Sequence, residues 1–483
     1  MQGIAMATEE LELEAAERHS PRSVKVFNPP RTACSLLSYL AIFAPPGVML
    51  FIIHHYTVNL PLGDEWDTLF LVLSDRHGTL SFAKLWAQHN EHRMLLVNIV
   101  SVLTARFTNY NVVANVYCGF AFEVLALLLV WRILRITLRG GDAVMVRPLV
   151  IYASLLMFWS VATENWFWGI SGLEFLSSVF WAIFVVWALA EWPGRWLGFA
   201  LAFIGAIAAI CTAAVGFPLL PVIGAGLVLS LRARKRQLVI QFAVFLILSV
   251  IFLAFFFKGW SPIFSFSAGQ PLWKSTAQAV EYAFTYLGSP FQTRFVWKTS
   301  MAIGIAGVGW FVWCSWKAMI RAVEFESEIV PWLLLGLYGI LNAALTGYGR
   351  RSLGLEQAVE STRYISIAET FWIALGVISG LHLRRWAAKP GRRRLVHAAP
   401  ATVIALFLVG YGISYYKAMA RLRSVNQALR AGVHAVLHYR TATDADLKGL
   451  HPMPHTVREM SKRLENNHIG PFANVPANEY DSN

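Results

Sequence analysis

The chain has 483 residues, of which 56% are hydrophobic and 14% charged, and its mean hydropathy is +0.51. This composition excludes an ordinary soluble domain and indicates a polytopic membrane protein. The formal net charge of +13 is not a sign of nucleic-acid binding, because no nucleic-acid motif is present and most basic clusters fall in loops between apolar segments.

An acidic segment precedes the apolar part of the chain. Residues 8–17 are rich in glutamate, and the first apolar run begins near Ala33. This is not the pattern of a cleavable signal peptide, whose charged start is basic. We therefore expect residues 1–32 to form a short cytoplasmic tail.

Long apolar segments fill the middle of the chain. A helix needs roughly 20 apolar residues to cross about 30 Å of hydrocarbon, and a chain of this length repeats such segments many times. The pattern predicts an all-α membrane domain over residues 33–416 with about eleven transmembrane helices. The predicted spans are 34–56, 112–131, 148–163, 170–190, 196–213, 215–231, 238–257, 299–316, 329–346, 364–383 and 400–416.

The first loop, residues 57–111, begins with the acidic motif Gly63-Asp64-Glu65-Trp66-Asp67. Acids are unusual so close to a membrane span and suggest a site. The structural alternative is that Asp64 caps a helix running to about Ser74, with Asp67 in its first turn. That helix would place Asp64 and Asp67 on one face and Glu65 on another. Both interpretations are open, and they are compatible.

The same loop continues with Gln88-His89-Asn90-Glu91-His92-Arg93. This segment could bind a phosphate or a metal, or it could be a solvated link between two surface helices. His89 and His92 are three residues apart, a spacing compatible with one helical face and shared ligation of a metal. A third ligand is not defined by the spacing, so phosphate binding is the preferred functional interpretation.

The apolar segment from Met94 to Phe107 is short for a span, so we place it at the membrane surface. With this assignment the basic loops at 132–147, 232–236 and 384–394 share the side of the N-terminal tail, as the positive-inside rule expects of the cytoplasm. If the segment crossed, these loops would all move outside. The segments then predicted on the outer face are 57–111, 258–298, 347–363 and 417–483.

The link Thr163-Glu164-Asn165-Trp166-Phe167-Trp168-Gly169 joins two predicted spans on the outer side. Its aromatic residues are typical of the belt at a membrane interface. They could instead bind a sugar acceptor, with Glu164 and Asn165 bonding its hydroxyls. Acids also lie within predicted spans. Glu174 and Glu369 could border a cavity, whereas Glu123 is interpreted as an interhelical hydrogen-bonding group or a proton relay.

The loop from Gly347 to Tyr364 concentrates arginines on the predicted outer face. Positive charge there opposes the usual bias, which favours a functional interpretation of Arg350, Arg351 and Arg363. Residues 417–483 are polar and predict a small helical outer appendage, with its clearest helix over 420–439. The basic charge of this tail counts against its outer placement.

Several of these features together resemble the integral-membrane C-type glycosyltransferases, the GT-C superfamily. They are Asp64-Glu65 soon after the first span, surface helices around Leu80–Ala87 and Arg93–Phe107, and Arg363-Tyr364 opening a later helix. The resemblance covers the architecture of most of the chain, although the motif itself is two residues. It implies a catalytic first outer loop and a sugar donor carried on a polyprenyl phosphate or diphosphate.

Such a transfer needs a base for the acceptor hydroxyl and cations for the departing phosphate, and Arg, Lys or His near the headgroups would provide the cations. The candidate catalytic residues are Asp64, Glu65 and Asp67. The candidates for donor-phosphate binding are His89, His92, Arg93, Arg350, Arg351, Arg363 and Tyr364. The candidates for acceptor binding are Glu164, Asn165, Trp166 and Trp168.

The expected function is transfer of a sugar from a polyprenyl-phosphate-linked donor to an envelope glycan, lipid or protein acceptor. We expect a bacterial inner membrane location with the N-terminus cytoplasmic and the C-terminus periplasmic or extracellular. The metal requirement is open, and a divalent cation is the one candidate cofactor. The alternatives are a transporter or flippase of a lipid-linked saccharide and a non-catalytic subunit of a glycan-assembly complex. A transporter would place its functional charges near the membrane midplane.

Overall fold

The structure is a computed structural model that describes most of the chain. The described residues are 31–138, 143–230, 235–261, 271–291, 296–320, 326–387, 412, 415, 416, 419 and 422–473. Within these ranges the protein is helical with no named strand, which confirms the predicted all-α class. The chain divides into a unit of Met1–Leu40 and a larger unit of Ala41–Asn483, and the core and site belong to the larger unit.

Seven helices in the described ranges are long and apolar enough to cross a membrane, judged by length and composition. A helix suits hydrocarbon because it pairs most of its own backbone groups, and where Pro46 interrupts the pattern in the first of these helices the Ile42 carbonyl accepts from Ser154 Oγ at 2.7 Å. The seven helices are α2 (Arg31–Tyr56), α6 (Val113–Thr137), α9 (Gly169–Glu191), α12 (Lys235–Phe256), α14 (Trp297–Ile320), α15 (Glu326–Arg350) and α17 (Ile365–Ala387).

Four shorter apolar helices accompany them: α5 (Leu95–Thr108), α7 (Ala143–Met157), α10 (Trp196–Ile210) and α11 (Leu219–Ser230). Three predicted spans, 148–163, 196–213 and 215–231, fall on α7, α10 and α11. The last predicted span, 400–416, lies almost wholly outside the described residues. The fold is therefore that of a helical membrane protein with seven candidate spans in its described part.

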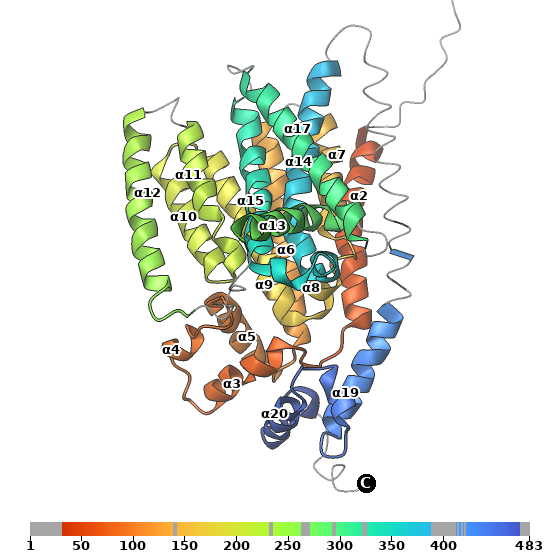
Figure 1. Ribbon diagram of the computed structural model, residues 1–483. Coiled ribbons are helices and arrows are strands. Elements are labelled where there is room, and N and C mark those ends of the chain that lie inside the picture. Colours follow the sequence, from red (N-terminus) through yellow and green to blue (C-terminus); the bar gives the residue numbers. More distant parts are fainter. Residues whose placement is uncertain are drawn as a thin grey trace, which may run out of the picture. The chain divides into compact units, whose positions relative to one another are not determined.

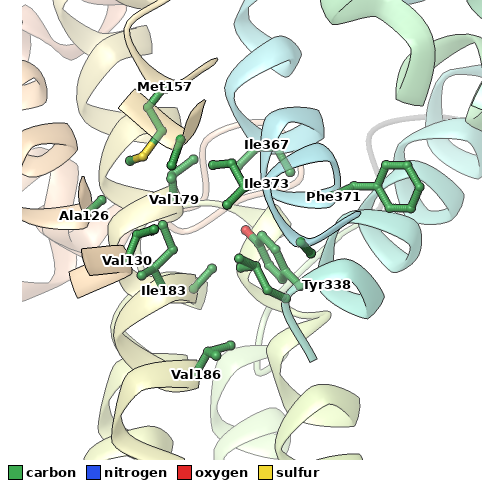
Figure 2. Close-up of a cluster of buried hydrophobic side chains, with 14 of the residues drawn as sticks. Ala126, Val130, Met157, Val179, Ile183, Val186, Tyr338, Ile367, Phe371 and Ile373 are labelled. Atoms are coloured by element: carbon green, nitrogen blue, oxygen red, sulfur yellow. The ribbon is translucent and has the colours of Figure 1, made fainter. Parts of the chain in front are cut away.

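The bundle interior is an apolar cluster to which most of the long helices contribute, and Figure 2 shows the part of it contributed by α6, α7, α9, α15 and α17. On α6 and α9 the labelled side chains recur three or four residues apart, which directs one face of each helix into the core. Small residues let α6 and α9 approach closely, since a Cβ at Gly119 would lie 2.9 Å from the backbone of Gly172. The cluster includes Ala126, Val130, Met157, Val179, Ile183, Val186, Tyr338, Ile367, Phe371 and Ile373.

Several short elements gather at one end of the bundle, which we call the α3 end (Figure 1). Helix α3 (Asp64–Arg76) confirms the helix expected to reach about Ser74. The predicted cap by Asp64 is wrong, because Gly63 is the N-cap residue, no side chain caps the helix, and Asp64 is its first residue. Of the predicted surface helices, the first is only the single turn α4 (Phe82–Leu85), and the second is α5.

The remaining elements connect these parts of the fold. The helices are α8 (Thr163–Phe167), α13 (Leu272–Gly288), α16 (Gln357–Glu360), α19 (Asp444–Lys448) and α20 (Pro454–Asn466). The 3-10 turns are η1 (Ala214–Gly216), η2 (Ser289–Phe291), η3 (Arg351–Leu353), η4 (Thr362–Tyr364) and η5 (Gly470–Phe472).

The predicted C-terminal appendage is helical over 422–437, close to the expected 420–439, and then in α19 and α20. It shares a second apolar cluster with α3, in which Trp66 and Leu69 meet Val457 and Leu464. Backbone hydrogen bonds fasten the two segments together, including one from Gly63 N to the carbonyl of Leu450 at 2.9 Å. The appendage is therefore packed directly against the start of α3.

Candidate functional site

A glycine turn sets the start of α3. Gly63 has a φ of +50°, a conformation that side chains other than glycine rarely adopt. A Cβ at this position would lie 2.6 Å from the Trp168 ring, so glycine also permits the close approach of that indole. Trp168 Nε1 donates to the carbonyl of Leu62 at 2.9 Å. These contacts place Asp64 beside the short helix α8 and the first turn of α9.

Asp64 faces a histidine from the following loop. Its Oδ2 lies 3.6 Å from His89 Nε2, an ion-pair distance slightly longer than a direct hydrogen bond. The interaction with His89 lowers the pKa of Asp64 below its ordinary value, and the charges of Arg363 and His451 act in the same direction against burial. Asp64 in turn raises the pKa of His89, while burial opposes that change. Asp64 is therefore held as a carboxylate.

The segment from His89 to His92 is a tight turn and not a helix. The two residues form an antiparallel bridge with reciprocal backbone hydrogen bonds of 3.0 and 2.9 Å, and Asn90 between them has a φ of +49°. The expectation that the two imidazoles share a helical face is therefore wrong. No group of three or more His, Cys, Asp or Glu residues is arranged to hold a metal within the described ranges.

His92 is buried and its tautomer is fixed by the backbone. Its Nδ1 accepts a hydrogen bond from Ala214 N at 3.0 Å, so the proton of the neutral ring lies on Nε2. That atom lies 3.8 Å from Glu174 Oε1 and 3.9 Å from Glu91 Oε1. Burial lowers the pKa of His92 to about 4, which keeps the imidazole neutral at neutral pH.

Arg350 and Arg363 reach the region around Asp64 and the histidine turn. Arg350, in the last turn of α15, donates to Glu91 Oε1 at 2.6 Å. Arg363, in η4, has its guanidinium carbon 5.7 Å from the Trp168 ring centroid and 5.5 Å from that of Tyr364. Arg363 also interacts electrostatically with Asp64. The structure thus brings together charges that are far apart in the sequence.

The backbone of Arg363 is fixed while its side chain retains a free donor. Its N–H donates to Glu164 Oε2 at 2.8 Å, and its carbonyl accepts from Asn165 Nδ2 at 2.9 Å. The side-chain Nε is buried and has no hydrogen-bond partner among the described residues. Its neighbour Tyr364 is buried, with its ring centroid 5.7 Å from that of Tyr286. A buried donor of this kind suits an anionic ligand.

We call these converging residues the α3-end cluster. Its acidic groups come from α3, the histidine turn and α9, its guanidinium groups from the end of α15 and from η4, and its two imidazoles from the histidine turn. The members are Asp64, His89, Glu91, His92, Glu174, Arg350 and Arg363. An ionised carboxylate beside a guanidinium with an unused donor can accept a proton and bind an oxyanion at neighbouring positions.

Glu65 has a structural environment very different from that of Asp64. It is 3% exposed, and its two carboxylate oxygens accept from Leu62 N at 2.9 Å and Ile170 N at 3.1 Å. Burial raises the pKa of Glu65 to about 8. Because Ile170 is in the first turn of α9, Glu65 satisfies a helix N–H group that would otherwise be unpaired. The side chain joins α3 to α9 and does not face the cluster's histidines.

Arg93 is hydrogen-bonded to backbone carbonyls outside the α3-end cluster. Its Nε, Nη1 and Nη2 donate to the carbonyls of Phe256, Trp86 and Lys258 at 2.8, 2.9 and 2.8 Å. The guanidinium therefore fastens the loop before α5 to α4 and to the end of α12. Arg351 Nε donates to Ser275 Oγ at 2.6 Å, and the Arg351 guanidinium lies over the ring of Tyr348. Because Ser275 belongs to α13, Arg351 is held at the α13 side of the loop.

The residues proposed for acceptor binding separate into two pairs. Asn165 and Trp166 are fully buried, and the Trp166 Nε1 donates to the carbonyl of Trp159 at 3.1 Å. Glu164 and Trp168 are only partly buried.

Asp67 turns toward the appendage, where its Oδ2 lies 3.5 Å from His451 Nε2. Asp64 and Asp67 both act electrostatically on His89. Asp67 therefore lies on the Asp64 side of α3, as the helical spacing predicted.

Glu91 and Glu174 are members of the cluster that the candidate sets left out. Glu174 carried a signal, namely an acid near the end of a predicted span. Glu91 lies between two candidate histidines, but its partner Arg350 is 259 residues away.

Comparisons with protein-family models, curated proteins and solved structures give no match to this chain.

Proposed function

We propose that the protein is a membrane glycosyltransferase of GT-C-like architecture that uses a polyprenyl-phosphate-linked sugar donor. The observation that carries the proposal is the pairing of Asp64, held ionised, with Arg363, whose buried Nε has no partner in the described part of the chain. The first is a base and the second a ligand for a phosphate oxygen. Both lie at one end of a bundle of membrane helices.

In the proposed reaction Asp64 removes the proton of the acceptor hydroxyl. The hydroxyl oxygen forms a bond to the anomeric carbon, the bond from that carbon to the phosphate oxygen breaks, and the phosphate leaves with the bonding electrons. Arg363 stabilises the charge on the leaving phosphate, where a preorganised cation is most effective. His89 keeps Asp64 ionised, and Glu91 orients Arg350 beside the same site.

The proposal includes about eleven spans, a bacterial inner membrane location, a cytoplasmic N-terminus and a periplasmic α3 end. The acceptor is a glycan, lipid or protein of the cell envelope, and no bound cation is required for the roles given to Asp64 and Arg363. The second candidate function is transport of a lipid-linked saccharide. It is favoured by Glu123 and Glu369, which are each 1% exposed in the bundle interior.

The test is turnover of radiolabelled polyprenyl-phosphate hexoses and pentoses by the protein in proteoliposomes, followed by release of polyprenyl phosphate. We expect Asp64→Asn to lower turnover about 10²- to 10⁴-fold, the usual range for loss of a general base. Asp75→Asn is the matched control, because Asp75 lies on the same helix and pairs with Arg106 instead. Equal turnover by wild type and Asp64→Asn would contradict the proposed base. Lipid movement without release would favour the transporter.

A further inference from the structure

A pocket of about 480 Å³ opens at the α3 end between α8 and the appendage. Its walls come from the turn before α3, from α8 and Trp168, from the 422–437 helix and from residues 448–452. The volume is in the range of cavities that bind small organic ligands. Three separate parts of the sequence therefore build one open pocket.

The pocket is lined mainly by apolar side chains. Phe167 and Trp168 form one wall, and Leu422, Val425 and Leu429 line the facing helix. The appendage helix is fixed near the end of α2, because Asn426 Nδ2 donates to the carbonyl of Tyr56 at 2.8 Å. Walls of this kind favour burial of a hydrocarbon group over a free, fully hydroxylated sugar.

A few polar groups interrupt the apolar lining. Glu164, Lys448 and His451 line the pocket together with Thr163. They offer acceptors and donors to hydroxyl groups, which gives the pocket an amphipathic character. No strand edge is found in the described residues, so a peptide could not bind them by adding a strand.

The pocket adjoins the α3-end cluster through shared residues. Gly63, which lines it, directly precedes Asp64. Glu164 lines it and accepts from the backbone N–H of Arg363, while Trp168 lines it and packs against the Arg363 guanidinium. An occupant with its polar end at these residues would lie next to both proposed functional groups.

We propose that this pocket binds the acceptor, and that the acceptor is a membrane lipid with a hydroxylated head. The inference rests on the proposed function. The apolar part of the lipid lies between Trp168 and the 422–437 helix, and the hydroxyl to be modified points past Glu164 toward Asp64. The appendage is thus one wall of the acceptor site.

The probe is decyl glucoside, used as acceptor by the full-length protein in nanodiscs with the donor that it turns over. Val425→Trp fills the pocket, and we expect the KM for decyl glucoside to rise about tenfold while hydrolysis of the donor by water continues unchanged. Ala431→Trp is the control, since Ala431 is exposed on the same helix. A rise of equal size in both variants, or in neither, would overturn the inference.

A second measurement does not depend on any variant. A decyl glucoside with a diazirine in its chain is photolysed with the wild-type protein, and the labelled peptides are identified by mass spectrometry. Labelling at residues 422–429 or 167–168 is expected, and labelling confined to other helices would contradict the acceptor site. Transfer to a hydroxyl-containing peptide in place of the lipid probe, at a rate that Val425→Trp does not change, would also contradict the acceptor site. Absence of donor hydrolysis and transfer in wild type would refute the proposed function itself.

Discussion

Buried or half-buried carboxylates occur in two regions of this molecule, and their partners differ between the two regions. At the α3 end, Glu65 accepts two backbone N–H groups, Glu91 accepts from Arg350, and Glu174 lies beside His92. In the bundle interior, Glu123 and Glu369 have four carboxylate oxygens without a hydrogen-bond partner in the described ranges. Both interior residues are 1% exposed, and they interact electrostatically with each other.

The difference separates two kinds of function. The partners at the α3 end hold acidic and basic side chains in defined positions, which suits proton transfer and phosphate binding. An unpartnered carboxyl in a bundle interior is costly to ionise, and such groups are characteristic of ion or proton pathways. The transferase proposal depends on the first region and the transporter alternative on the second. Substitutions in each region therefore discriminate between them.

The largest effect is expected from Arg363→Ala. Loss of the guanidinium removes the proposed phosphate ligand, so kcat/KM for the donor should fall about 100-fold or more, with partial recovery in Arg363→Lys. Donor turnover in proteoliposomes measures this change. Arg351→Ala provides the comparison, because Arg351 is bonded to Ser275, and it should change turnover less than about fivefold. Similar losses in the two alanine variants would remove the special role of Arg363.

An intermediate effect is expected from His89→Gln. His89 lowers the pKa of Asp64, so its removal raises that pKa and moves the acidic limb of kcat/KM to higher pH. The pH profile of donor turnover reports the shift. His77→Gln, at the exposed end of α3, should leave the profile in place. A profile for His89→Gln identical to wild type would show that Asp64 is not the titrating group.

The smallest effect is expected in the bundle interior. Glu123→Gln and Glu369→Gln keep the side-chain volume and remove the ability to ionise, so donor turnover should stay within about twofold of wild type. The same proteoliposomes report lipid translocation with a fluorescent polyprenyl-phosphate analogue. Loss of translocation or turnover in either variant would shift the functional region from the α3 end to the interior.

The helices and the convergence of Asp64 with Arg363 could be predicted from the sequence. Apolar runs of membrane length define α6, α9 and α15 because hydrocarbon leaves the backbone no other partner. The position of Asp64 after a first span and of Arg363 before a late one indicated a common side. That inference required only topology.

Other parts of the site depend on local backbone conformation or on partners that are distant in the sequence. Neither can be predicted from the residue pattern of a single sequence. The positive φ of Asn90 turns the histidine segment back on itself, where spacing alone allowed a helix. Arg93 had the right residue type for phosphate but meets three carbonyls contributed by α4 and the end of α12. Glu65 and Asp64 are adjacent, yet the 100° step between helical neighbours sends one to α9 and the other to His89.

The hydrogen bond from Gly63 N to Leu450 has a consequence for biogenesis. Residues 444–473 leave the ribosome after every described membrane helix has been made, and they bond the N-cap residue of α3 and pack on the apolar face of that helix. The α3-end cluster therefore cannot reach its final arrangement during synthesis of the bundle. The start of α3 therefore stays without its contacts to the appendage until residues 444–473 have been synthesised.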